Sequence, residues 1–226
     1  FGATGETLLE ISTDGGLNWA TYSAAATFPA DGRLLARTPI RQDPVYEGSE
    51  TFTLTATAAG GTGATGTATI RDDGTGAIFK ADGSADTTAP RDDDRPISIA
   101  PVTVNEATPY AVFRVEASGG QQFALSLRDG PSHSDSLVST ATAGADYRNS
   151  LETYDGVKWI PYTPDTLIKV PNGGSVLLVR VPIMNDSEYE DAHAFTLIAT
   201  IPGAVPVTGN GIIGDFGTGA IFNDSG

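Results

Sequence analysis

One block of sequence occurs twice in this chain, with acidic residues at matching positions. Residues 39–52 are PIRQDPVYEGSETF and residues 182–195 are PIMNDSEYEDAHAF. Asp43 in the first block corresponds to Asp186 in the second, and the offset between them stays constant along both blocks. The distance along the sequence between the two blocks is long enough for each repeat to build its own core. The repeat therefore predicts tandem domains and not a single domain.

The pattern of apolar residues predicts an all-β fold. Apolar stretches are short and rich in Val, Ile, Thr and Phe, and clusters of Gly, Pro, Asp and Asn separate them. Phe123, Leu125 and Leu127 alternate with polar neighbours, which is typical of a strand with one buried face. About seven to nine such strands are expected in the second copy, which favours tandem immunoglobulin-like β-sandwiches with minimal helix.

The two copies are unequal in length. We expect a truncated module with only the later strands at 1–79, an Asp-rich linker at 80–96 and a complete module at 97–226. The counterpart of roughly residues 95–142 is missing from the first copy, and a sandwich without its opening strands would leave edges and inner faces bare. We therefore expect either that the first module belongs to a longer natural protein or that a partner chain supplies the strands.

The linker has the sequence KADGSADTTAPRDDDRP. Its Gly, Ser, Thr and Pro residues favour a solvated connection, whereas three successive aspartates, Asp92, Asp93 and Asp94, repel one another unless something neutralises them. Two interpretations stay open, an acidic flexible linker and a joint stiffened by calcium.

Charge and composition exclude several classes of partner. The chain has 28 acidic and 13 basic residues and a formal net charge of −15, so its surface repels nucleic acid and anionic lipid. Solubility explains scattered acids, but not those that recur at fixed places in both copies. No cysteine is present, no apolar run reaches about 18 residues, and the first ten residues lack the pattern of a signal segment, so neither a disulfide, a membrane span nor an export signal is expected.

The recurring acids are candidate metal ligands. Hard divalent cations, calcium above all, bind six to eight oxygens from carboxylates, carbonyls and water, and the loops of a sandwich gather at its poles. In the first module and the joint, the candidates are Asp43, Glu47, Asp72, Asp73, Asp92, Asp93 and Asp94. In the second module, they are Glu106, Asp146, Asn185, Asp186, Glu190 and Asp215.

The order of these motifs resembles a known family. VTVNE is followed by TAGADY, by an acidic loop before the FTL strand, and by IGDF before a Gly-rich close. This order resembles the Calx-β domain, a calcium-binding immunoglobulin-like sandwich. The DG-x-W insert and the GTGAIF ending are similar to the version repeated in large bacterial surface proteins, including RTX-type adhesins.

The resemblance implies calcium ligands at five positions, namely Glu106, Asp146, Asp186, Glu190 and Asp215. Departures from the family pattern imply fewer or weaker sites: Asn185, Ser187 and Phe216 stand where acids are common. The first module also lacks counterparts of Glu106 and Asp146.

Other side chains have weaker claims to function. Trp19 and Trp159 recur in both copies, which favours packing over a sugar-binding platform. The two histidines, His133 and His193, lack the spacing of a zinc site, and His193 is expected at the rim of a strand. The serines of residues 132–136 lack a nucleophile motif, and the GTG segments lack the Lys of a phosphate loop, so an enzyme is not expected.

Together these features predict a calcium-stiffened extender repeat of a large secreted bacterial adhesin that positions a distal binding domain. Its expected location is the bacterial cell surface, and its expected partners are neighbouring repeats. The alternative is a carbohydrate- or host-surface-binding module that uses Trp159 and Tyr162.

Overall fold

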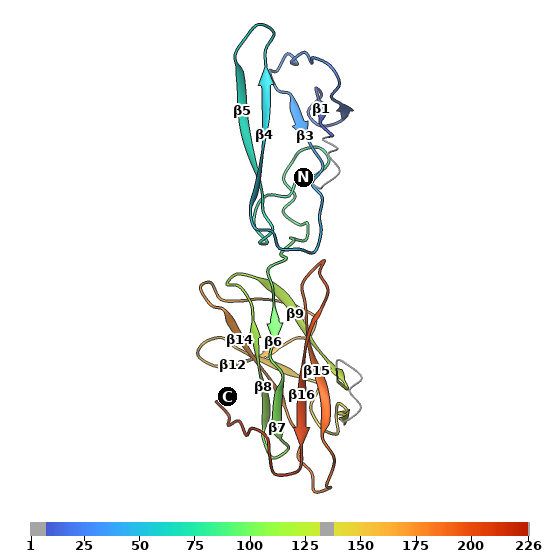
Figure 1. The fold of residues 1–226 in the computed structure, drawn as a ribbon, viewed down its shortest axis with the longest axis vertical. Coiled ribbons are helices and arrows are strands. Elements are labelled where there is room, and N and C mark those ends of the chain that lie inside the picture. Colours follow the sequence, from blue (N-terminus) through green and yellow to red (C-terminus); the bar gives the residue numbers. More distant parts are fainter. Residues whose placement is uncertain (1–7, 132–137, 226) are drawn as a thin grey trace. The chain divides into compact units, whose positions relative to one another are not determined.

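The computed structural model describes residues 8–131 and 138–225 of the chain. His133 and the serines of residues 132–136 lie outside the described residues. The described chain is all-β, as the sequence predicts, and contains no helix that could span a membrane. It forms two compact units (Figure 1), and the second unit includes Tyr46–Gly48 and Asp72–Gly74 together with Asp92–Gly226.

The second unit is a β-sandwich of two sheets. One sheet has the order β12-β11-β14-β8-β6, and the other has the order β13-β9-β15-β16-β7, with the short β10 paired to β15. The strands of this unit are β6 (Ser98–Ile99), β7 (Val102–Asn105), β8 (Tyr110–Glu116), β9 (Gln122–Asp129), β10 (Ser139–Thr140), β11 (Leu151–Tyr154), β12 (Trp159–Tyr162), β13 (Leu167–Lys169), β14 (Val176–Pro182), β15 (His193–Thr200) and β16 (Val207–Gly214).

Aromatic side chains from both sheets meet in the core of this unit. Phe113 on β8 contacts Phe195 on β15 edge-to-face with ring centroids 5.7 Å apart, and Tyr147 stacks on Phe195 at 4.5 Å. All three are buried, as are Phe123 and Leu125 on β9. Burial of each large apolar side chain stabilises the unit by roughly 1.5–3 kcal/mol. The alternation seen in the sequence of β9 therefore marks its inner face.

The first unit has fewer strands. Its strands are β1 (Glu10–Ser12), β2 (Ala20–Thr21), β3 (Leu35–Arg37), β4 (Glu50–Thr57) and β5 (Gly63–Ile70). They form a three-stranded sheet of order β2-β1-β3 and a separate β4-β5 hairpin, the long pair of strands in Figure 1. The hairpin is mostly exposed, so this module is an incomplete sandwich.

The register of the hairpin repeats in the second unit. Glu50 pairs with Ile70 on β4 and β5, and His193 pairs with Ile213 on β15 and β16. Both partners thus shift along the chain by the offset that relates the two acidic blocks. The sequence repeat is therefore a repeat of strand pairing.

Arg180 of the second unit contacts a carboxylate, a backbone carbonyl and an aromatic ring, and we call this arrangement the arginine clasp. Arg180 on β14 donates through Nε to Glu152 at 2.5 Å and through Nη1 to the carbonyl of Asp224 at 2.7 Å. Its guanidinium lies over the Trp159 ring, 4.6 Å from the centroid. The clasp thereby fastens the segment that follows the GTGAIF motif.

The first unit contains the same clasp. Arg37 donates to Glu10 at 2.7 Å and to the carbonyl of Ala81 at 3.2 Å, and it lies 4.1 Å from the centroid of Trp19. This arrangement supports the packing interpretation of the two tryptophans. The 80–96 segment is divided between the units, with residues through Arg91 in the first and Asp92 onward in the second.

Candidate metal centres

A tight loop after β10 positions Asp146 in the second unit. The backbone N–H groups of Ala145 and Asp146 donate to the carbonyl of Thr142, and Asp146 Oδ2 accepts the Thr142 N–H at 2.7 Å. Gly144 has φ +92°, a conformation that glycine adopts without a steric cost. The next residue, Tyr147, is buried and donates its hydroxyl to Asp129 at 2.6 Å. The TAGADY motif therefore anchors this carboxylate through local turn chemistry and a core aromatic residue.

His193 brings an imidazole to this carboxylate. Its Nδ1 lies 2.7 Å from Asp146 Oδ1 and 3.5 Å from Glu190 Oε2, and one ligand atom from each of the three residues lies within 4.8 Å of the others. The side chains are 19%, 11% and 39% exposed for His193, Asp146 and Glu190. We call these three residues the histidine cluster. Its nitrogen donor suits ions such as Zn²⁺ that accept imidazole, whereas Ca²⁺ prefers oxygen donors alone.

Sequence reasoning placed His193 at a strand rim and did not count it among the ligands. The sequence contained a signal that His193 could be a ligand, because an acidic residue, Glu50, occupies the equivalent position in the first copy. The second copy therefore has an imidazole where the first has a carboxylate, at the start of the equivalent strand.

Glu106 is a buried residue whose carboxyl group has Glu190 of the histidine cluster among its electrostatic neighbours. It follows β7, its side chain accepts the backbone N–H of Asp186 at 3.0 Å, and its residue is 7% exposed. Burial raises the pKa of Glu106, and the neighbouring carboxylates of Asp215, Asp186 and Glu190 raise it further. These four acidic groups are thus close enough to repel one another electrostatically. A bound divalent cation would relieve this repulsion.

The remaining predicted ligands of the second module, Asn185, Asp186 and Asp215, do not join the histidine cluster. Asn185 and Asp186 are exposed, and Asp186 Oδ1 accepts the backbone N–H of Glu188 at 2.7 Å. Asp215 is half-buried directly after β16. The D-x-x-x-E motif of residues 186–190 therefore contributes Glu190, and not Asp186, to that cluster.

A second cluster consists only of carboxylates. Asp72, Asp92 and Asp94 each place one oxygen within 4.8 Å of the others, and all three residues belong to the second unit. We call them the aspartate cluster. The N–H of Asp94 donates to the carbonyl of Asp72 at 3.3 Å, and Asp72 Oδ2 accepts the backbone N–H of Glu47 at 2.9 Å. Its oxygen-only donor set matches the preference of Ca²⁺ and Mg²⁺.

Asp73 and Asp93 form a β-bridge beside this cluster. Asp93 is buried and holds Arg95 through two contacts, 2.7 Å to Nε and 2.6 Å to Nη2. A Cβ on Gly74 would lie 2.9 Å from Asp93 Oδ2, so glycine leaves room for this ion pair. Among the predicted aspartates of the joint, Asp93 thus neutralises an arginine while its two neighbours reach the cluster.

The side chains of the other candidates in the first copy, Asp43 and Glu47, belong to neither cluster. Asp43 is exposed and accepts the N–H of Val45 at 3.1 Å, and the exposed Glu47 takes part through its backbone N–H. The D-x-x-x-E motif therefore contributes a side chain, Glu190, to a cluster in the second copy and none in the first copy.

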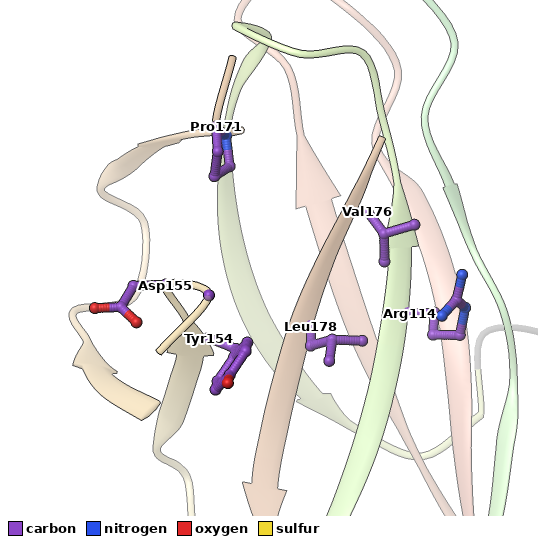
Figure 2. Close-up of a pocket in the computed structure, with 7 residues that line it drawn as sticks. Arg114, Tyr154, Asp155, Pro171, Val176 and Leu178 are labelled. Carbon is purple, nitrogen blue, oxygen red and sulfur yellow. The ribbon is translucent and has the colours of Figure 1, made fainter. Parts of the chain in front are cut away.

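A shallow hollow of about 370 Å³ lies on the outer face of the second unit. Figure 2 shows Tyr154, Val176 and Leu178 along it, with the Asp155 carboxylate turned outward. Backbone N–H groups of Lys158 and Val157 lower the pKa of Asp155 and hold its carboxylate in its own turn. The hollow is thus mainly apolar and separate from both clusters.

The aromatic residues of the sugar-binding alternative are occupied in packing. Trp159 is half-buried beneath Arg180, and Tyr154 lies 5.3 Å from it between ring centroids. The Tyr162 hydroxyl accepts the Leu125 N–H at 2.8 Å and donates to the Thr166 carbonyl. The exposed platform that this alternative requires is not formed by these two side chains.

Comparison with known proteins gives weak likenesses. No family model matches the chain, and no curated protein matches it. Among solved structures, the calcium binding domain CBD12 of CALX1.1 is similar at 18% identity and TM-score 0.37, over 53% of this chain and 44% of that one. The apo-form Calx CBD1 domain is similar at 16% identity and TM-score 0.34, over 53% and 96% of the two chains.

A third similar structure is the CsuC-CsuE chaperone-tip adhesion subunit complex of Acinetobacter baumannii, at 12% identity and TM-score 0.35 over 57% of this chain and 62% of that one. The chain spans less than half the length of the first of these structures. The fold assignment therefore rests on the strand order and core packing described above.

Proposed function

We propose that this chain is a non-catalytic, calcium-stiffened repeat of a large secreted bacterial adhesin and that it positions a distal binding domain. The observation that carries the proposal is the aspartate cluster, in which oxygens of Asp72, Asp92 and Asp94 converge within 4.8 Å. Three carboxylates at this separation repel one another, and a divalent cation replaces that repulsion with shared coordination.

The position of this cluster along the chain links it to stiffness. The second unit includes three short stretches through which the chain leaves or re-enters the first unit, near Tyr46–Gly48, Asp72–Gly74 and Asp92. Asp72 and Asp92 come from two of these stretches, and the backbone of Glu47 in the third donates to Asp72. A cation held here ties these stretches together, so calcium would restrict motion at the joint.

The same chemistry supports the proposed extracellular setting. Sites with few carboxylates bind calcium weakly, and the millimolar calcium outside cells suits such sites. On this proposal, bound metal is the external stabiliser of a chain that has no cysteine. On this proposal neighbouring repeats are the partners and the bacterial surface is the location.

The test compares the wild type with a D92N/D94N variant, using D191N as the control because Asp191 is exposed and lies outside both clusters. Calcium at about 100 times its Kd should stabilise the wild type and D191N by about 2.7 kcal/mol, and D92N/D94N by much less. Thermal unfolding and titration calorimetry with and without EDTA measure this. Small-angle scattering measures the stiffening. Equal melts of the wild type in calcium and EDTA would contradict calcium binding, whereas binding without a change in scattering would contradict only the extender role.

A further inference from the structure

The histidine cluster does not have the donor set of a calcium site. The family resemblance implies five carboxylate ligands in the second unit, all of them within the described residues, yet only Asp146 and Glu190 contribute atoms to the cluster. The third atom is the Nδ1 nitrogen of His193. Calcium binds six to eight oxygens, so two carboxylates and one imidazole nitrogen match it poorly. The donor set therefore points to a different class of ion.

The pairing of β10 with β15 fixes the place of the imidazole. The N–H groups of Ser139 and Ala141 donate to the carbonyl groups of the residues directly before and after His193, at 3.0 and 2.8 Å. The loop that carries Asp146 follows β10 directly in the chain. Backbone hydrogen bonds therefore bring this carboxylate and the imidazole together, and the side chains need not be ordered by an ion.

The two oxygens of Asp146 have separate partners. Oδ2 accepts the Thr142 N–H at 2.7 Å, and Oδ1 lies 2.7 Å from His193 Nδ1. The Asp146 and His193 side chains are mostly buried, whereas the Glu190 side chain is more open to solvent. Hydrogen bonds that orient a ligand in this way commonly raise metal affinity. The cluster thus has two pre-positioned ligands and a third at its open side.

The number and charge of these ligands suit zinc. Zinc sites that keep an open position have three protein ligands and one water, and imidazole and carboxylate are both common among them. A neutral imidazole and two carboxylates together balance the charge of one divalent ion. An Nδ1–H group can donate its single hydrogen to one carboxylate at a time, whereas an ion in its place is shared by both carboxylates.

The imidazole distinguishes this cluster from the rest of the repeat. Glu50 occupies the position of His193 in the first copy, and the aspartate cluster has oxygen donors alone. The described chain therefore contains two clusters that differ in their donor atoms, and metal ions sort between sites by this difference.

We propose that the histidine cluster is a site for Zn²⁺, or for another transition-metal ion that accepts imidazole, and that calcium does not displace this ion. His193 Nδ1, Asp146 Oδ1 and Glu190 Oε2 are the protein ligands, and water completes the coordination. The ion joins the loop after β10 to the start of β15 and so stabilises the second unit. Zinc binding here is independent of calcium binding at the aspartate cluster, because the two clusters share no residue.

The first test is a titration of the full chain with Zn²⁺ in the presence of excess Ca²⁺. Calorimetry should show a single Zn²⁺ site in the wild type, and His193→Gln should weaken binding by roughly tenfold or more. His133→Gln is the matched control, because it removes the only other histidine of the chain and should bind Zn²⁺ as the wild type does. Equal affinities of the wild type and His193→Gln, a loss in His133→Gln, or a Zn²⁺ signal abolished by calcium would overturn the proposal.

A second measurement separates a ligand from a residue that only supports the fold. In His133→Gln, every imidazole signal in the NMR spectrum comes from His193, and Zn²⁺ should shift the Nδ1 resonance to that of a metal-bound nitrogen. The melting temperature of the second unit should rise with Zn²⁺ in this variant and stay constant in His193→Gln. Because the NMR experiment uses the intact cluster, it does not depend on the folding of His193→Gln. An unchanged Nδ1 resonance at saturating Zn²⁺ would refute the assignment.

Discussion

Alanine substitutions at the two equivalent glycines should have opposite effects on stability. Gly209 on β16 is packed against β6, and a Cβ there would lie 2.3 Å from Ile99 Cγ2, 2.8 Å from its Cβ and 3.0 Å from its carbonyl oxygen. Ordinary contacts begin near 3.4 Å, so the Ile99 side chain and the β6 backbone must both shift. Overpacking of this kind costs about 1–3 kcal/mol.

Gly66 on β5 is the internal control for Gly209. It occupies the same place in the repeat, and no atom of the described residues lies within 4 Å of its Cβ position. Neither glycine has a positive φ, so alanine fits both backbones. Gly66→Ala should stabilise the first unit by about 0.4–1 kcal/mol, because it reduces the entropy of the unfolded chain.

Differential scanning calorimetry measures both changes, and hydrogen exchange assigns each transition to a unit. Gly209→Ala should lower the melting temperature of the second unit by roughly 2–12 °C, given about 2–4 °C for each kcal/mol in a domain of this size. Gly66→Ala should raise the melting temperature of the first unit by a few degrees, as a stabilisation of about 0.4–1 kcal/mol implies. A wild-type melt for Gly209→Ala, or an equal loss from both variants, would refute the packing difference between the units.

Three further predictions concern the clasp and the acidic pole. Arg180→Leu should destabilise the second unit by about 2–4 kcal/mol, because it leaves the partly buried Glu152 unpaired and removes a cation–π contact; Arg37→Leu should cost about 1 kcal/mol or less, since that side chain is 39% exposed. Urea unfolding measures both, and similar losses would contradict the difference in burial. The raised pKa of Glu106 means that its charge opposes folding at neutral pH and that this penalty disappears as pH falls through the raised pKa. Without metal, Glu106→Gln should therefore melt above the wild type at pH 7, with the gap closing toward pH 4; a gap that widens on acidification would reverse the sign. His193→Glu should weaken Zn²⁺ binding at the histidine cluster by roughly tenfold or more, equivalent to about 1.4 kcal/mol, and strengthen Ca²⁺ binding. Calorimetric titrations with each ion measure this. An unchanged Zn²⁺ affinity would mean that the imidazole is not a ligand.

The sequence was sufficient for the repeat, the strands and the all-β class, because these depend on local patterns. Alternation of apolar residues marks the inner face of β9, and the repeat in sequence became a repeat of strand register between β4-β5 and β15-β16. The glycine and aspartate of TAGADY fold into a turn through contacts within five residues. Such features need no knowledge of distant partners.

Only the tertiary structure decided which acids meet. Asp146 and His193 are far apart along the chain, and the pairing of β10 with β15 brings them within 2.7 Å. Asp93 and Asp94 are adjacent in sequence, yet one binds Arg95 and the other reaches Asp72, because backbone pairing with Asp73 separates their side chains. Composition and spacing identify carboxylates that can bind a cation, but the fold of the surrounding backbone determines the direction in which each one points.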